Sequence, residues 1–225
     1  MSREVRRVSA LEGYDLWADT YDATPNPVVA MDARHSLRVL TPAAGELILD
    51  AGCGTGRNLG AMVAAGAAPV GIDFSAGMLK IAHHEQPGVR LALADLQRDL
   101  PIRDASFDAV LCALVGEHLA DLPAVLAELR RVIKPGGRLV FSVYHPEMAA
   151  AGIEANFDLA DVEYRLGAQK YGVQDYLDVV SRLNFDDVAF ASFKGDDALA
   201  RLVPAARRFI DQPMLLVIAA IAGQP

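Results

Sequence analysis

The sequence predicts an α/β protein built around a parallel β-sheet. Between residues 47 and 144, short apolar runs alternate with segments that have helical periodicity, which is typical of βαβ units. The apolar runs are nearly continuous, as expected for strands that are buried on both faces of a sheet. A glycine-rich turn follows the first run, at the edge where such sheets bind their ligands.

Composition excludes several other classes of protein. Of the 225 residues, 52% are hydrophobic and 22% are charged, which is usual for a globular chain. The 21 basic and 29 acidic side chains give a net charge of −8, so we expect no nucleic-acid partner. Two cysteines are too few for a disulfide framework or an all-cysteine zinc site.

We expect no membrane segment and no signal peptide. The longest wholly apolar run, residues 214–222, is about half as long as a membrane span. Residues 1–8 contain three arginines and lack the apolar core of a signal peptide. The sequence therefore predicts a cytoplasmic protein.

Two helices are expected ahead of the sheet. The first covers residues 14–21, and the second follows Asn26, a capping residue, and runs to about residue 40. Pro27 suits the first turn of this second helix because its missing N–H has no partner there anyway.

The strands and helices of the sheet follow in alternation. Ser75 and Asp121 are expected to cap two of the helices, and a Lys-Pro-Gly-Gly sequence ends the second one. Residues 146–172 are the least periodic stretch, and a helix is expected after them at residues 173–183. The expected strands are residues 47–49, 69–72, 89–94, 109–114, 139–143, 188–193 and 214–222.

The glycine-rich turn is the most informative motif. Gly52, Gly54 and Gly56 follow the first strand and precede a helix that is expected to begin near Arg57. Glycine lets the backbone turn tightly and lets a ligand approach, while a helix N-terminus attracts a carboxylate or phosphate. The spacing differs from the dinucleotide pattern, because the third glycine comes one residue early, and the lysine of a Walker loop is absent. A turn needed only for packing is the alternative.

An aspartate lies near the end of each of the first three strands. Asp50, Asp73 and Asp95 should share one edge of the sheet, because the carboxyl ends of parallel strands meet there. The carboxylate of Asp73 can accept hydrogen bonds from both hydroxyls of a ribose. Asp95 can accept one from the amine of an adenine, with Phe74 and Leu96 against the ring. Each aspartate alone could equally be a turn or capping residue.

With these motifs, the sequence resembles the class I S-adenosylmethionine-dependent methyltransferases, of the small single-domain kind that acts on small molecules. The resemblance implies a Rossmann-like, doubly wound sheet of seven mostly parallel strands, the last of them antiparallel. It also implies S-adenosylmethionine as the cofactor. The stretches that match are residues 49–56, 70–78, 94–96, 107–118 and 132–143.

The resemblance also divides the chain and gives its residues roles. One methyltransferase domain, residues 1–225, would consist of a helical lid (1–42), a cofactor-binding core (43–145), an insertion on the substrate side (146–172) and the C-terminal part of the sheet (173–225). The residues expected to bind the cofactor are Asp50, Gly52, Gly54, Gly56 and Ala113, Asp73, and Asp95 with Phe74 and Leu96. The resemblance places the three glycines and Ala113 at its methionine end, Asp73 at its ribose, and Asp95 with Phe74 and Leu96 at its adenine.

Residues 14–22 resemble the aromatic lid that precedes the core in many relatives. Aromatic faces stabilise a sulfonium cation as they do an ammonium. We expect Tyr14 and Tyr21 to contact the cofactor and Trp17 to be mostly structural.

Two histidines are candidates for an acid–base group. His118 and His145 follow the fourth and fifth strands, and therefore belong to the same edge as the cofactor. Pro146 restricts the backbone beyond His145, so we expect His145 rather than His118 to act on the acceptor. A structural histidine in a loop is the alternative at both positions. No set of residues typical of a magnesium site is recognisable, so we expect no metal.

The predicted function is transfer of a methyl group from S-adenosylmethionine to an O, N or C atom of a small-molecule acceptor. The acceptor would be enclosed by residues 14–40 and 146–171. A nicotinamide-dependent oxidoreductase on a related sheet and a non-catalytic S-adenosylmethionine-binding protein are the alternatives. The sequence predicts no oligomeric state.

Overall fold

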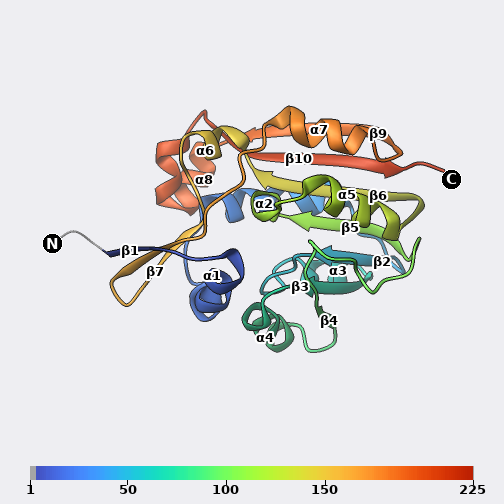
Figure 1. The fold of residues 1–225 in the computed structure, drawn as a ribbon, viewed down its shortest axis with the longest axis horizontal. Helices are drawn as coiled ribbons and strands as arrows, with labels where there is room; N and C mark the ends of the chain where they lie inside the picture. Colours follow the sequence, from blue (N-terminus) through green and yellow to red (C-terminus); the bar gives the residue numbers. More distant parts are fainter. Residues whose placement is uncertain (1–3, 225) are drawn as a thin grey trace.

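The computed structural model describes residues 4–224, and its centre is a seven-stranded sheet (Figure 1). The strand order is β4-β3-β2-β5-β6-β10-β9. The first five strands of this order run parallel, whereas β10 is antiparallel to both β6 and β9. This confirms the predicted Rossmann-like sheet. The strands are β2 (Leu47–Ala51), β3 (Ala68–Asp73), β4 (Arg90–Leu93), β5 (Phe107–Ala113), β6 (Ile133–Tyr144), β9 (Phe185–Lys194) and β10 (Pro213–Ala222).

Several helices pack on this sheet through their apolar faces. Helix α2 contacts β5, β6 and β10. Helix α5 contacts β6, helix α7 contacts β10, and α5 and α7 also contact each other. The helices are α1 (Ala10–Trp17), α2 (Pro27–Leu40), α3 (Leu59–Ala64), α4 (Ala76–Glu85), α5 (Leu122–Val132), α6 (Pro146–Ala150), α7 (Val173–Ser181) and α8 (Asp197–Leu202), with 3₁₀ turns η1 (Ala18–Thr20), η2 (Gly116–His118) and η3 (Pro204–Phe209).

The capping residues explain where several helices begin. The side chain of Asn26 accepts hydrogen bonds from two backbone N–H groups of α2, and Ser75 and Asp121 cap α4 and α5 as predicted. The first helix begins at Ala10, four residues earlier than predicted, because Ser9 accepts a hydrogen bond from the N–H of Glu12. Helix α3 is short and begins at Leu59.

A second, three-stranded sheet was not predicted. It joins β1 (Glu4–Arg7) to a hairpin of β7 (Asn156–Leu159) and β8 (Val162–Arg165), in the order β1-β8-β7. Residues 1–42 are therefore not wholly helical, and residues 146–172 are more regular than their sequence suggests. The two segments fold against each other, as Figure 1 shows at its left side.

Aromatic packing joins the same two segments. Trp17 is 3% exposed and stacks on Phe157, with the ring centroids 4.9 Å apart. Phe157 stacks in turn on Tyr164 of β8. Most of the Trp17 side chain is therefore used in packing, as the sequence predicts.

The N-terminal segment is also held to the main sheet. Asp15 accepts hydrogen bonds from the hydroxyl of Ser75 and the N–H of Gly77, at the start of α4. Asp22 accepts one from the hydroxyl of Thr55 in the glycine-rich turn, at 3.0 Å. These bonds keep α1 and η1 over the carboxyl ends of β2 and β3. Within residues 4–224, no helix combines the length and the apolar composition needed to cross a bilayer.

Candidate functional site

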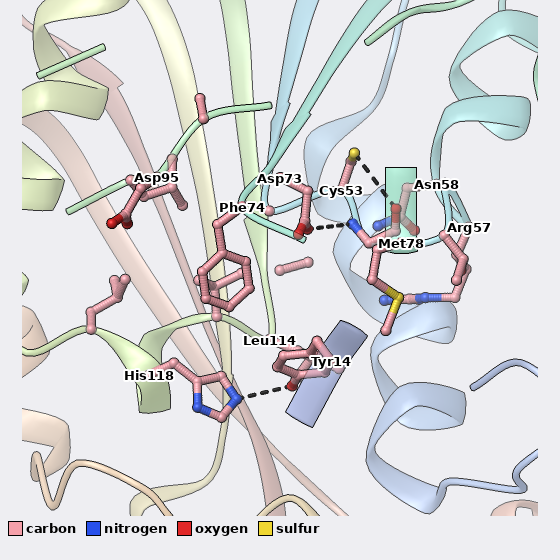
Figure 2. Close-up of a pocket in the computed structure, with 18 of the residues that line it drawn as sticks. Tyr14, Cys53, Arg57, Asn58, Asp73, Phe74, Met78, Asp95, Leu114 and His118 are labelled. Atoms are coloured by element: carbon pink, nitrogen blue, oxygen red, sulfur yellow. Dashed lines mark hydrogen bonds between the residues drawn. The ribbon is translucent and has the colours of Figure 1, made fainter. Parts of the chain in front are cut away.

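A cavity lies at the carboxyl ends of β2, β3 and β5, and we call it the glycine-turn cavity (Figure 2). It contains most of the residues that the sequence predicts at a cofactor, although they come from five separate segments. The predicted residues that line it are Tyr14, Tyr21, Gly52, Gly54, Asp73, Phe74, Asp95, Leu96, Ala113 and His118.

The glycines of the turn have a backbone that favours glycine. Gly52 and Gly54 have φ values of 80° and 54°, in the left-handed region. A Cβ on Gly52 would lie 2.4 Å from Cγ2 of Val115, whereas a Cβ on Gly54 would enter open space. Gly56 also has positive φ, but it packs on Ala82 and Leu59 and is absent from the cavity lining. The turn therefore leaves space for a ligand at Gly54.

Asp73 is the central acidic group of the cavity. Its carboxylate accepts hydrogen bonds from the N–H of Gly54 at 2.8 Å and the N–H of Ser75 at 2.9 Å. Burial raises the pKa of Asp73 above its ordinary value, although these backbone bonds act in the opposite direction. Each carboxylate oxygen has a second lone pair that remains available to a ligand.

Asp95 lies on the side of the cavity formed by the segment after β4. Its side chain is 41% exposed and accepts a hydrogen bond from the N–H of Gln97. Phe74 and Leu96 line the same cavity, so the structure brings together the three residues that the sequence predicts around an adenine.

Asp50 does not join the other two aspartates. It is fully buried, and it is absent from the cavity lining. Neither carboxylate oxygen has a hydrogen-bond partner among the described residues, and burial raises the pKa of Asp50 to about 7. Asp50 thus lies near the carboxyl end of β2 as expected, but its expected place at the cofactor is not supported, because its side chain lies in the interior below the turn.

Arg57 supplies a cation to the cavity. Its Nη2 donates a hydrogen bond to Asp32 of α2 at 2.7 Å, and Asp32 also accepts bonds from the hydroxyls of Ser36 and Ser142. Nη1 of Arg57 is buried and has no hydrogen-bond partner among the described residues. The guanidinium can therefore bind one more anionic group.

Tyr14 and His118 form one wall of the glycine-turn cavity. The hydroxyl oxygen of Tyr14 lies 2.9 Å from Nε2 of His118, and the two rings meet edge to face (Figure 2). Burial lowers the pKa of His118 to about 4, so its imidazole is neutral near neutral pH.

A second cavity adjoins the first, and we call it the neighbouring cavity. Tyr14, Tyr21 and Leu114 line both. Leu114 has a φ of 58°, which is uncommon for a residue other than glycine and is found at functional sites. The rest of the neighbouring cavity comes from Trp17, Glu117, residues 24–29 at the start of α2, residues 144–156 and residues 205–209. Most of it therefore lies between the segments that the sequence predicts around the acceptor.

The neighbouring cavity is mostly aromatic and apolar, with two buried polar groups. Oε2 of Glu117 and the hydroxyl of Tyr144 have no hydrogen-bond partner among the described residues. Both side chains belong to residues that are 7% exposed. Burial raises the pKa of Glu117 to about 7.

His145 lies outside both cavities, and its expected role on the acceptor is not supported. Nδ1 accepts a hydrogen bond from the N–H of Glu147 and thereby caps α6, while Nε2 lies 3.1 Å from the hydroxyl of Ser192. Both nitrogens are thus used in structural contacts. The ranking of His145 above His118 is corrected, because only His118 lines a cavity.

Sequence reasoning missed Arg57, Leu114 and Glu117. In the sequence, Arg57 marks only the expected start of a helix, and Leu114 gives no sign of its backbone conformation. Glu117 precedes His118 directly, so its place after the fourth strand was the one available signal. Among residues 4–224, no group of three or more His, Cys, Asp or Glu side chains could hold a metal ion, and the absence of a metal stays a prediction.

Comparisons with known proteins agree with these motifs. Residues 49–141 match the model of a family described as a methyltransferase domain. The demethylmenaquinone methyltransferase of Clavibacter sepedonicus is 38% identical over 148 residues, which cover 62% of this chain and 59% of that protein. The malonyl-[acyl-carrier protein] O-methyltransferase of Serratia marcescens is 41% identical over 98 residues, which cover 44% of this chain and 38% of that protein.

A solved structure has a similar fold. The S-adenosylmethionine-dependent methyltransferase from Mesorhizobium loti matches with a TM-score of 0.73 and 23% identity, over 87% of this chain and 100% of its own. At this identity the likeness concerns the fold alone. The chain spans less than two thirds of the length of the two curated relatives.

Proposed function

Because this chain contains a class I S-adenosylmethionine-dependent methyltransferase domain, we propose that it transfers the methyl group of S-adenosylmethionine to a small-molecule acceptor in the neighbouring cavity. The observation that carries this proposal is the junction of the two cavities at Tyr14, Tyr21 and Leu114. A donor in one cavity and an acceptor in the other would meet at this junction.

The residues of the glycine-turn cavity fit the cofactor. The open space at Gly54 admits a ligand close to the backbone, and the unpartnered Nη1 of Arg57 suits the carboxylate of a methionine group. Asp73 would accept hydrogen bonds from the ribose hydroxyls. Asp95 would accept one from the adenine amine, with Phe74 and Leu96 beside the ring.

Methyl transfer from this cofactor needs alignment more than acid–base chemistry. The bound cofactor supplies a methyl group on a sulfonium, with the leaving group already in place. The task of the chain is then to align the acceptor and to exclude water. Tyr14 and Tyr21 would face the sulfonium and stabilise its charge. His118, neutral near neutral pH, would hold Tyr14 in position.

A labelled-methyl assay tests this proposal. The protein is incubated with methyl-labelled S-adenosylmethionine and a panel of phenols, amines and carboxylic acids. We expect label in at least one product, and less of it with Asp73→Ala. Cofactor binding without transfer to any member of the panel would favour the non-catalytic alternative, and failure to bind the cofactor would refute the proposal.

A further inference from the structure

We propose that Glu117 accepts the proton of the acceptor and that the acceptor is a neutral aromatic hydroxyl compound. This inference rests on the proposed function and assigns a substrate class to the neighbouring cavity. It places a catalytic residue outside the two histidines that the sequence indicated.

The position of Glu117 is fixed by a short element next to the junction of the cavities. The 3₁₀ turn η2 (Gly116–His118) begins two residues after Leu114, which lines both cavities. Glu117 lines the neighbouring cavity, while His118 lines the glycine-turn cavity. A hydrogen bond from a distant segment also fixes the backbone of η2, because the carbonyl of Glu117 accepts a hydrogen bond from the N–H of Gln169.

The carboxyl group of Glu117 has free hydrogen-bonding capacity. Its Oε2 is buried and has no partner among the described residues. The hydroxyl of Tyr144, at the end of β6, lines the same cavity and also has no partner within residues 4–224. Unpaired polar atoms are costly to bury, so two of them in one cavity indicate a ligand that pairs with them.

The other charged groups of this cavity are already engaged. Glu154 forms ion pairs with Arg7 and Arg165. The guanidinium of Arg208 lies over the ring of Phe209, 4.6 Å from its centroid. Glu117 is therefore the carboxylate with free capacity among the described residues of the lining.

The surroundings of Glu117 favour proton exchange near neutral pH. Burial, together with the nearby charge of Asp32, raises the pKa of Glu117 to about 7. A general base works best when its pKa lies near the working pH, and an ordinary glutamate is too weak. The other titratable groups that interact with Glu117 are Tyr14 and Tyr21 of the N-terminal segment, Cys112 of β5, Tyr144 of β6 and Tyr176 of α7.

The lining indicates an aromatic acceptor and disfavours a carboxylate. Tyr14, Trp17, Tyr21, Tyr144 and Phe209 provide flat apolar surfaces for a ring. A carboxylate acceptor would be repelled by ionised Glu117, and it would have no proton to give. A neutral phenol satisfies both unpaired polar groups, because its hydroxyl donates to Glu117 and can accept from Tyr144.

The step balances in atoms and charge. As the acceptor oxygen forms its bond to the methyl carbon, the bond between that carbon and sulfur breaks and its electron pair stays on sulfur. The hydroxyl proton passes to the carboxylate of Glu117. The products are a methyl ether, neutral S-adenosylhomocysteine and a protonated Glu117, which returns its proton to water after product release.

Binding of three matched probes tests the substrate class without turnover. With S-adenosylhomocysteine at saturation, calorimetry compares 1-naphthol, its methyl ether and 1-naphthoate. We expect 1-naphthol to bind at least tenfold more tightly than the other two, and Glu117→Ala to remove that preference. The inference is overturned if the wild type binds 1-naphthol no more tightly than the other two probes, or if it binds none of the three.

Kinetics of Glu117→Gln tests the proton transfer, with 1-naphthol and labelled S-adenosylmethionine. Wild-type kcat should rise with pH through about pH 7, and the variant should lose about a hundredfold in kcat together with this rise. Tyr144→Phe should keep the pH profile and weaken 1-naphthol binding several-fold. Exposed Glu85→Gln is the matched control. An unchanged profile in Glu117→Gln, or no methylation of 1-naphthol by the wild type, overturns the inference.

Failure of the proposed function and failure of the Glu117 assignment would give different experimental results. If the wild type does not bind S-adenosylhomocysteine, the proposed function itself fails. If it binds and methylates another class of acceptor equally well with and without Glu117, only the assignment of Glu117 fails. The thermal midpoint of Glu117→Gln checks folding, and we expect no decrease because the variant buries no unpaired carboxyl group.

Discussion

The hydroxyl of Tyr14 and Nε2 of His118, 2.9 Å apart, join the N-terminal helix to the turn after β5 where the two cavities meet. The pair connects residues that are 104 positions apart in the chain. Since Tyr14 lines both cavities, this contact fixes a side chain that would face both donor and acceptor.

Removing this contact should weaken cofactor binding. Tyr14→Phe keeps the ring and loses a hydrogen bond worth about 1 kcal/mol, so we expect the Kd of S-adenosylhomocysteine to rise about fivefold. Calorimetric titration measures it. Tyr164→Phe is the control and should bind like the wild type, because Tyr164 lines neither cavity. Equal affinity of Tyr14→Phe and wild type would show that the pair does not order the cavity.

Alanine substitutions at two glycines with positive φ distinguish backbone strain from a loss of ligand binding. Gly54 and Gly45 have φ values of 54° and 81°, and a Cβ at either would meet no atom within 4 Å. Replacing either with alanine should lower the free energy of unfolding by about 1 kcal/mol. Only Gly54→Ala should also weaken the binding of S-adenosylhomocysteine, because the methyl group of the new alanine enters the cavity. Similar affinities in the two variants would contradict the assignment of Gly54.

Arg57 should contribute both to the stability of the fold, through its ion pair with Asp32, and to cofactor binding. Arg57→Leu leaves Asp32 buried without its cation, and we expect a loss of about 3 kcal/mol in the free energy of unfolding. Adding Asp32→Asn should restore most of that stability but not cofactor affinity. Denaturant unfolding and calorimetry measure the two effects. Recovery of affinity in the double variant would exclude a contact between Arg57 and the cofactor.

The buried carboxyl of Glu117 should make stability depend on pH. Burial raises its pKa from the ordinary 4.5 to about 7, so the folded chain holds a proton that the unfolded chain has lost. Stability from this group is therefore complete below about pH 4.5 and falls as pH rises toward 7, by up to about 1.4 kcal/mol per unit. Relative to the wild type, Glu117→Gln should gain stability across this window. A constant difference between the two would contradict the shift.

The sequence predicts the main sheet because its strands carry their own signal. The apolar runs of β2, β3 and β5 are buried on both faces, and caps such as Ser75 and Asp121 mark the helices between them. The small sheet has no such signal. Glu4–Arg7 is exposed and mostly polar, and it becomes a strand only because it pairs with Val162–Arg165, far along the chain.

The same distinction applies to the candidate site. Asp73, Asp95 and Gly54 could be placed from sequence because strand ends and a turn determine where their backbone lies. The directions of side chains could not. His145 follows a strand as expected, but its ring turns toward α6 and Ser192, and Asp50 points into the interior. The role proposed for Glu117 rests on a buried Oε2 that has no partner among the described residues, and this depends on packing from distant segments.

Binding of S-adenosylhomocysteine and NADH to the wild type and to Asp73→Ala distinguishes an S-adenosylmethionine site from a dinucleotide site. We expect S-adenosylhomocysteine to bind one site per chain and NADH not to bind. Asp73→Ala should weaken the binding of S-adenosylhomocysteine by about 2 kcal/mol, roughly thirtyfold. Binding of NADH, or an unchanged affinity for S-adenosylhomocysteine in Asp73→Ala, would contradict the assignment of the cavity to S-adenosylmethionine.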